Sequence, residues 1–382
     1  MAGAAGSGGP GPPGRLGDGV SGPPEIIRPR DWGRETPLPP LGLVPAGSFE
    51  PEAVKQLKQE EGVPVYLVFP LGSSREAGNL EDLLGLLRPL YGGLIDQVWI
   101  AYGGRRPEGL RRLSAVMPQV RVFPAARRLP PDQEQAPLGK GASMRAFLYN
   151  LIMSEGVKQS RAVVAFLDAD IRPAYFEPRW VVDPVGAILW FRAAEAAKTV
   201  YQRPHGGRLN TMLRSLLALC PHAGVQALQK LAYLLSGEMA GTLKFWLRLP
   251  FKTGYGVEIL TLLAFALNQL NLEPGTPDLE HLVQVYVGQM DHRHAPLTST
   301  PRKRGLDQMA GTVFYTLMES LMAADLWRWQ APPIEEPQLS IPVPDGPNGT
   351  PLAWMEVPLA DATLAPLATL PEVQARLTPG DF

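Results

Sequence analysis

Four short apolar runs separated by stretches of helical spacing constrain the fold of this chain more than any other feature. They occupy residues 65–69, 97–102, 120–123 and 162–167. A strand that is apolar throughout is typical of a parallel sheet covered by helices on both faces. The intervening patterns predict helices at residues 79–90, 107–117 and 142–153. Strands that alternate with helices in this way predict an α/β fold with a mainly parallel sheet.

Glycine and proline mark the limits of the folded part. The chain contains 39 glycines and 41 prolines among its 382 residues. Their combined share is well above the usual level of about 12%, and much of the excess lies at the two ends. We therefore expect a disordered or extended Gly/Pro-rich tail at 1–46 and a Pro-rich tail at 331–382 that lies over the domain surface or helps assembly. Between them we expect an α/β half at 47–175 and a mostly helical half at 176–330, with helices at residues 208–219, 223–235, 256–270 and 305–324.

Charge and cysteine content exclude several classes of protein. The 36 Lys and Arg residues balance the 37 Asp and Glu residues, so nothing in the overall charge indicates a nucleic-acid partner or a polybasic membrane surface. Apolar runs fall well short of the roughly 20 residues that span a bilayer, which predicts no membrane partner. The single cysteine, Cys220, has no second thiol with which to form a disulfide. We expect a soluble protein of the reducing cytoplasm.

Two carboxylates follow the fourth apolar run. Asp168 and Asp170 are separated only by Ala169. Alternate side chains of an extended segment point the same way, so both can converge at the carboxyl edge of the sheet, where open α/β sheets bind ligands. Hard oxygen donors suit Mg²⁺ or Mn²⁺. The alternative is an N-capping aspartate with a solvated neighbour.

Three further polar segments could meet an anionic ligand. Lys140 lies between two glycines before a helix, and Gly207 and Arg208 open another helix. Backbone amides and basic side chains at such places can bind phosphate, although the alternative for both is a turn that needs positive φ. His292 and His294 bracket an arginine in a polar loop, where an imidazole could reach a cation. That loop could equally be an exposed one with no ligand.

Two glutamates lie beside glycines in otherwise apolar stretches. They are Glu238 in the run Ser-Gly-Glu-Met-Ala and Glu258 in Gly-Tyr-Gly-Val-Glu. A carboxylate in such a place is costly unless it is paired or hydrogen-bonded, so both are candidate site residues. For Glu258 the alternative is a charge that stabilises the first turn of a helix.

Seven segments in order carry a resemblance to a known family. They are Gly139-Lys140-Gly141 and the runs at 166–170, 201–204, 206–208, 236–240, 250–259 and 291–297. In sequence and order they resemble the retaining glycosyltransferases of the GT-A fold that make glucosyl-3-phosphoglycerate, with the mannosyl-3-phosphoglycerate enzymes as close relatives. The resemblance implies a Rossmann-like, mainly parallel sheet with a helical acceptor-binding C-terminal part, and a homodimer.

The resemblance also assigns roles to residues. It implies a site for Mg²⁺ or Mn²⁺ formed by Asp168, Asp170 and His292, and catalytic roles for Glu258, Glu238 and Asp170, of which Glu258 orients the acceptor hydroxyl. The implied nucleotide-sugar site comprises Pro70, Leu71, Lys140, Asp168 and Ala169. The implied acceptor site comprises Gly207, Arg208, Asn210, Thr211 and His294.

The expected activity is the transfer of glucose from a nucleotide diphosphate sugar to the 2-hydroxyl of 3-phosphoglycerate. The runs at 71–76 and 101–106 differ from the family pattern, so the nucleotide contacts are not carried over. Mannosyl transfer from GDP-mannose to 3-phosphoglycerate or glycerate therefore stays an alternative. An alternative of another class is a GT-A-like module that binds nucleotide without turnover and assembles through its Pro-rich tails.

Overall fold

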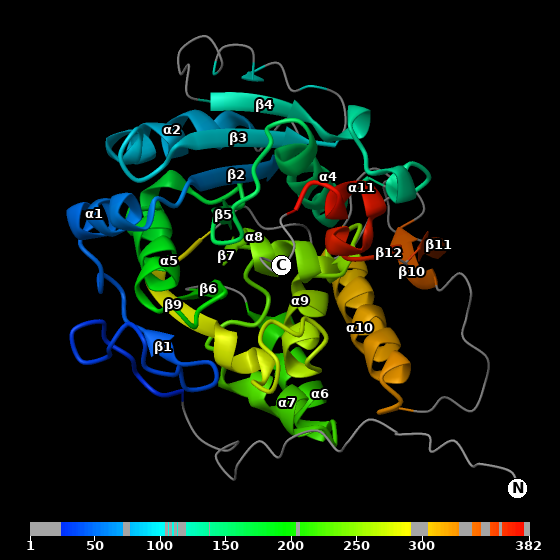
Figure 1. Ribbon diagram of the computed structural model, residues 1–382. Helices are drawn as coiled ribbons and strands as arrows, with labels where there is room; N and C mark the ends of the chain where they lie inside the picture. Colours follow the sequence, from blue (N-terminus) through cyan, green and yellow to red (C-terminus); the bar gives the residue numbers. More distant parts are fainter. Residues whose placement is uncertain are drawn as a thin grey trace, which may run out of the picture.

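The computed structural model describes residues 24–71, 77–103, 106, 109–110, 113, 120–136, 138–203, 207–291, 305–327, 338–344, 352–358 and 361–377. An eight-stranded sheet with the order β1-β9-β6-β7-β5-β2-β3-β4 runs through the molecule (Figure 1). Its strands are β1 (Leu43–Val44), β2 (Val65–Leu71), β3 (Gln97–Tyr102), β4 (Val120–Pro124), β5 (Val163–Phe166), β6 (Ala196–Gln202), β7 (Met239–Thr242) and β9 (Leu282–Gln289). All its pairings are parallel except those of β7 with β5 and with β6. The predicted α/β fold with a mainly parallel sheet is confirmed.

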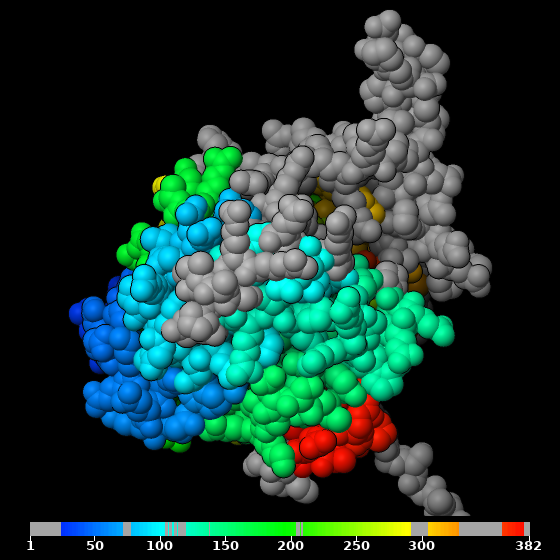
Figure 2. Space-filling view, turned by 90° about the horizontal axis from the view of Figure 1, so that it is seen from above, coloured from blue at the N-terminus to red at the C-terminus, as the bar shows by residue number. Residues whose placement is uncertain are grey.

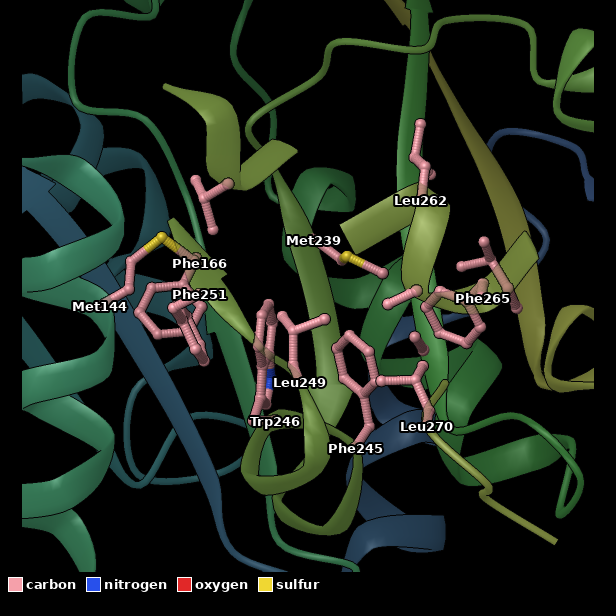
Figure 3. Close-up of a cluster of buried hydrophobic side chains, with 14 of the residues drawn as sticks. Met144, Phe166, Met239, Phe245, Trp246, Leu249, Phe251, Leu262, Phe265 and Leu270 are labelled. Carbon is pink, nitrogen blue, oxygen red and sulfur yellow. The ribbon is translucent and has the colours of Figure 1, made fainter. Parts of the chain in front are cut away.

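Helices cover both faces of the sheet, as the continuous apolar strands require. The α-helices with described bounds are α1 (Pro51–Glu61), α2 (Ala77–Leu87), α4 (Lys140–Met153), α5 (Arg179–Trp190), α6 (Arg208–Leu219), α7 (Ala223–Ala227), α8 (Leu243–Arg248), α9 (Gly256–Ala266), α10 (Leu306–Ala323) and α11 (Pro371–Gln374). Alternate residues of β5 enter different cores: Val164 and Phe166 pack with α4, α8 and α9, whereas Val163 and Ala165 pack with α1, α2 and α5. Figure 3 shows part of the first core, in which Phe166 meets Trp246 edge to face with ring centroids 4.9 Å apart.

Residues 176–330 contain helices, α5 to α10, and also strands that the sequence patterns did not predict. Strands β6, β7 and β9 come from this half and supply the centre and one side of the sheet. Their sequences lack the unbroken apolar runs of β2 and β5: β6 contains Lys198 and Thr199, β7 contains Gly241, and β9 contains Gln284, all of them buried. The helix predicted at 223–235 also stops early, at Ala227, and a 3-10 turn follows at Leu228–Lys230.

Both predicted tails contribute to the fold. Residues 1–23 and most of 328–360 lie outside what the structure describes in full. From residue 24 onward the N-terminal part packs on the core: Ile27 and Leu41 are buried, and β1 pairs with β9. Near the other end, β10 (Gln338–Pro344) pairs with β11 (Leu352–Pro358), and β12 (Thr363–Leu364) pairs with β8 (Phe251–Lys252). A few large apolar residues are therefore enough to anchor segments that are otherwise rich in Gly and Pro. No helix in the described ranges has the length and apolarity needed to cross a membrane.

Helix α5 carries a buried carboxyl group whose ionisation affects stability. Asp183 accepts hydrogen bonds from the backbone N–H groups of Gly47 (2.7 Å) and Phe49 (3.3 Å), and burial raises its pKa to about 6. The pKa of Asp183 is higher in the folded state than in the unfolded state. Its favourable contribution to the free energy of unfolding is therefore complete below about pH 4 and is lost as the pH rises through about 6. We expect Asp183→Asn to remove a pH-dependent part of the free energy of unfolding of about 1–3 kcal/mol between pH 4 and pH 7. Urea unfolding of both proteins across this range checks it, and parallel curves would contradict it.

Candidate functional site

Four segments far apart in the sequence bring charged side chains together at one edge of the sheet. Lys140 is the first residue of α4, Asp168 follows β5, Glu258 lies in the first turn of α9, and Glu238 immediately precedes β7. The Lys140 Nζ lies 2.6 Å from Asp168 Oδ1 and 2.9 Å from Glu258 Oε1. The lysine and Glu258 side chains are each 13% exposed, so both are largely screened from solvent. The structure thus brings together four of the residues predicted from the sequence, Lys140, Asp168, Glu238 and Glu258.

The protonation of Lys140 is decided by its three carboxylate neighbours. Burial would lower its pKa, but Asp168, Glu258 and Glu238 outweigh this and raise the pKa well above its ordinary value. Lys140 is therefore a permanent cation at neutral pH. A fixed cation at the N-terminus of a helix favours binding of a phosphate group.

Glu238 is buried in the wall of the same site. Its Oε2 accepts a hydrogen bond from the Tyr201 hydroxyl at 3.2 Å, while Oε1 has no hydrogen-bond partner in the described part of the chain. Burial, and next the negative charge of Asp168, raise the pKa of Glu238 to about 8. In its protonated form, Glu238 can donate a hydrogen bond to a ligand oxygen.

A second buried lysine joins the site and was missed by the sequence reasoning. Lys198 of β6 is 2% exposed, and its Nζ donates a hydrogen bond to the Ser236 carbonyl oxygen at 2.9 Å. Burial lowers its pKa to about 8 against the opposing effect of Glu258 and Glu238. The available signal was a lysine in the middle of the run Ala-Ala-Lys-Thr-Val-Tyr.

A pocket opens between these groups, with charge on one side and apolar side chains on the other. Its residues are Lys140, Met144, Lys198, Ser236, Gly237, Met239, Trp246, Val257, Glu258 and Thr261. Three of its apolar residues, Met144, Met239 and Trp246, belong to the buried hydrophobic cluster drawn in Figure 3. A partly apolar pocket with a few converging polar groups is the usual form of a small-molecule site.

The glycines of the motifs are required by close packing. A Cβ on Gly237 would lie 2.0 Å from Lys140 Nζ and 2.5 Å from Asp168 Oδ2. On Gly139 and Gly141 it would lie 2.4 Å and 1.9 Å from the carbonyl oxygens of Thr253 and Lys252. Gly139 has a φ of −148°, so the positive-φ alternative is wrong for this residue. Gly207, with a φ of 84°, does adopt it.

Four of the five predicted acceptor residues, Gly207, Arg208, Asn210 and Thr211, lie at the start of α6. Asn210 is buried, and its Oδ1 accepts a hydrogen bond from the Leu234 N–H at 2.7 Å. Thr211 is exposed and bonds back to Gly207 O at 3.4 Å. Arg208 begins α6, but its side chain and all of His294 lie outside the described residues. The acceptor site therefore stays a prediction.

The metal site is described only in part. Within the described ranges no group of three or more His, Cys, Asp or Glu residues could hold a metal ion, and the predicted third ligand, His292, lies outside them. Asp168 and Asp170 both follow β5 at the carboxyl edge, and their oxygen donors fit a hard divalent cation. Pro70 and Leu71 end the neighbouring parallel strand β2, which places them at the same edge as the buried Ala169.

Comparison with known proteins shows that the chain is similar to a group of enzymes. No family model matches the chain. The chain is 29% identical over 276 residues to glucosyl-3-phosphoglycerate synthase from Mycolicibacterium smegmatis, a match that covers 69% of this chain and 80% of that protein. It is 29% identical over 254 residues to the enzyme of the same name from Mycobacterium tuberculosis, covering 62% and 68%.

Solved structures share the fold. Glucosyl-3-phosphoglycerate synthase from Mycobacterium tuberculosis, in complex with Mn²⁺, uridine diphosphate and phosphoglyceric acid, matches with a TM-score of 0.64, 24% identity and coverage of 84% of this chain and 94% of that one. Mannosyl-3-phosphoglycerate synthase from Rubrobacter xylanophilus matches with a TM-score of 0.67, 21% identity and coverage of 85% and 96%. The predicted resemblance is thereby confirmed: the chain has the fold of the GT-A glycosyltransferases and is similar in sequence to the glucosyl-3-phosphoglycerate synthases.

Proposed function

We propose that this protein is a divalent-metal-dependent, retaining hexosyltransferase that moves glucose from a nucleotide diphosphate sugar to the 2-hydroxyl of 3-phosphoglycerate, giving glucosyl-3-phosphoglycerate and the nucleoside diphosphate. The observation that carries this proposal is the convergence of Lys140, Asp168 and Glu258. It joins a cation, a predicted metal ligand and a second carboxylate at the pocket. The shared name of the similar enzymes supports the choice of sugar and acceptor.

The chemistry of transfer requires that charge on the departing diphosphate be stabilised. Asp168, Asp170 and His292 would hold Mg²⁺ or Mn²⁺, which supplies electrostatic stabilisation of that leaving group when bound. Lys140 would exchange its contact with Asp168 for the diphosphate and add a second fixed positive charge. Ala169, Pro70 and Leu71 would border the nucleotide-sugar at this edge of the sheet.

The two glutamates would act on the sugar and the acceptor. Glu258 would orient the acceptor hydroxyl from the pocket wall, and Glu238, whose pKa is raised by burial, would donate a hydrogen bond toward the sugar when it is protonated. The acceptor's phosphate or carboxylate would lie at Gly207, Arg208, Asn210, Thr211 and His294. We propose that the acceptor hydroxyl attacks on the face from which the diphosphate leaves, so that the anomeric configuration is retained. This route needs an oriented hydroxyl and forms no covalent intermediate on the protein.

Mannosyl transfer is the second candidate. It is favoured by the mannosyl-3-phosphoglycerate synthase whose structure matches this chain with a TM-score of 0.67. Donor choice depends on nucleotide contacts near residues 72–76 and 104–105, which lie outside the described residues. The donor therefore has to be determined by experiment.

Product formation tests the proposal directly. The purified protein would be incubated with Mg²⁺, with UDP-, ADP- or GDP-glucose or GDP-mannose as donor, and with 3-phosphoglycerate or glycerate as acceptor. Mass spectrometry should detect glucosyl-3-phosphoglycerate, with the yield abolished by EDTA. A mannosylated or glycerate product would establish the second candidate, and no product from any pair would favour the non-catalytic nucleotide-binding alternative.

Arg208→Ala should weaken acceptor binding selectively. A bidentate charge-assisted contact is worth about 1.5–3 kcal/mol, so KM for 3-phosphoglycerate should rise about 10- to 100-fold while KM for the donor changes little. Arg121→Ala is the control, since Arg121 pairs with Glu155 on the surface, away from the site. Initial-rate kinetics with each substrate varied would check this. An equal effect on both KM values would remove Arg208 from the acceptor site.

We also propose that the enzyme works in the cytoplasm as a homodimer. The single, buried Cys220 suits a reducing compartment, and the dimer follows from the family resemblance. Analytical ultracentrifugation would test the oligomeric state.

A further inference from the structure

The segment 361–377, here called the C-terminal segment, is bound to the elements that carry the site. Its strand β12 pairs antiparallel with β8, with Thr363 opposite Lys252 and Leu364 opposite Phe251. The Thr253 N–H extends this ladder by donating to Ala362 O at 3.1 Å. In the space-filling view the segment, in red, forms part of the surface (Figure 2), and in Figure 1 its helix α11 lies beside α4.

Asp361 reaches from this segment to the turn that opens α9. Its Oδ2 accepts a hydrogen bond at 3.1 Å from the N–H of Gly256, the first residue of the helix. A Cβ on Gly254 would lie 2.4 Å from Asp361 Oδ1, so the turn is packed directly on the carboxylate. The residue at the N-cap position, Tyr255, provides no side-chain cap. Asp361 therefore satisfies an N–H that has no partner within the helix, and its charge is favourable at this end.

The same segment also holds the helix that presents Lys140. Arg145 of α4 is fully buried, and its Nε and Nη2 donate to Ala365 O at 3.1 Å and 2.8 Å. The start of α4 is fixed on the other side of β8, where the Ala142 N–H donates to Thr253 O at 3.0 Å. Both α4 and the turn before α9 are thus held by hydrogen bonds or packing to the same short pair of strands, β8 and β12, and the residues next to them.

Lys252 of β8 also binds the backbone of Asp361. Its side chain is 1% exposed, and its Nζ donates to the Asp361 carbonyl oxygen at 2.9 Å and pairs with Glu319 of α10. Because the backbone of Asp361 is held here and its side chain meets Gly256, the carboxylate has little freedom to leave the turn.

We propose that Asp361 is a positioning residue for the transfer reaction, which caps α9 so that Glu258 stays opposite Lys140. Glu258 lies two residues after Gly256, and its 2.9 Å contact with Lys140 depends on where the first turn of α9 is placed. A catalytic group displaced by about 1 Å can cost about 10²-fold in rate. The inference rests on the proposed function for the role of Glu258, whereas the cap itself does not.

Kinetics of three variants test the inference. Asp361→Ala should lower kcat about 10- to 100-fold with the donor KM changed less than about threefold, because the diphosphate contacts remain. Asp361→Asn should recover most of kcat, since its amide oxygen can still accept from Gly256. Val373→Ala is the control: Val373 is fully buried in α11 of the same segment, so this change weakens packing of the segment and leaves the carboxylate in place.

A second measurement separates the inference from the proposed function. Hydrogen exchange of the Gly256, Val257 and Glu258 amides should be at least about tenfold faster in Asp361→Ala than in the wild type or Val373→Ala. Unchanged exchange would overturn the inference, as would an unchanged kcat in Asp361→Ala or an equal loss of kcat in Val373→Ala. If the wild-type protein transfers no sugar, the proposed function fails, and the exchange rates still decide whether Asp361 holds the turn.

Discussion

Asp170→Ala is expected to abolish metal-dependent sugar transfer, with kcat at least about 10³-fold below wild type. The change removes one of the two carboxylates of the predicted metal site and leaves Asp168 engaged with Lys140. A divalent cation on a departing diphosphate contributes several kcal/mol, and each 1.36 kcal/mol is about tenfold in rate. Kinetics against Mg²⁺ and Mn²⁺ concentration would show whether the dependence on metal is lost.

Binding and folding controls make this result specific. Calorimetry should show that Mg²⁺ strengthens donor binding to the wild type and has little effect on Asp170→Ala. Circular dichroism should show an intact fold, because Asp170 lies in the turn after β5 and outside both hydrophobic cores. Asp82→Ala, at an exposed position of α2, should behave as wild type. Full residual transfer by Asp170→Ala would exclude Asp170 from the metal site.

Lys140→Met should have the second largest effect, a fall in kcat of about 10²- to 10³-fold. The substitution keeps most of the length of the side chain and removes the charge that faces Asp168 and Glu258. Two partly buried carboxylates then lose their partner, so the free energy of unfolding should also fall by about 1–3 kcal/mol. Transfer kinetics and urea unfolding measure the two effects separately.

Lys58→Met is the matched control for Lys140→Met. Lys58 is 8% exposed, and its Nζ contacts Asp96 Oδ1 at 2.7 Å and Gly93 O at 3.1 Å, on α1 and away from the pocket. It should lose stability of the same order and keep its kcat. If the two variants lost activity equally, the effect of Lys140 would be one of stability, and its proposed contact with the diphosphate would be wrong.

Part of the fold could be predicted from local sequence patterns. Strand β3 occupies the predicted residues 97–102, and β5 and helix α6 lie where the periodicity placed them. Strands β6 and β9 were not predicted because they bury the polar residues Lys198 and Gln284, which break the apolar run from which a strand is recognised. Strand β7 is only four residues long and contains Gly241, a residue that is depleted in strands. The low strand propensity of these segments is offset by tertiary contacts, because β6 and β7 lie in the interior of the sheet with a paired strand on each side.

By itself the sequence determined the fold class, the edge of the sheet that carries Asp168 and Asp170, and the family resemblance, because these depend on short apolar runs and on residue order along the chain. Only the tertiary structure decided which side chains meet. Lys140 and Glu258 are separated by 118 residues, and Arg145 meets Ala365 across 220. Such contacts depend on how helices and strands pack, which no local periodicity records. That is why the buried Lys198 and the cap formed by Asp361 became visible only once α4, α9 and β12 were placed around β8.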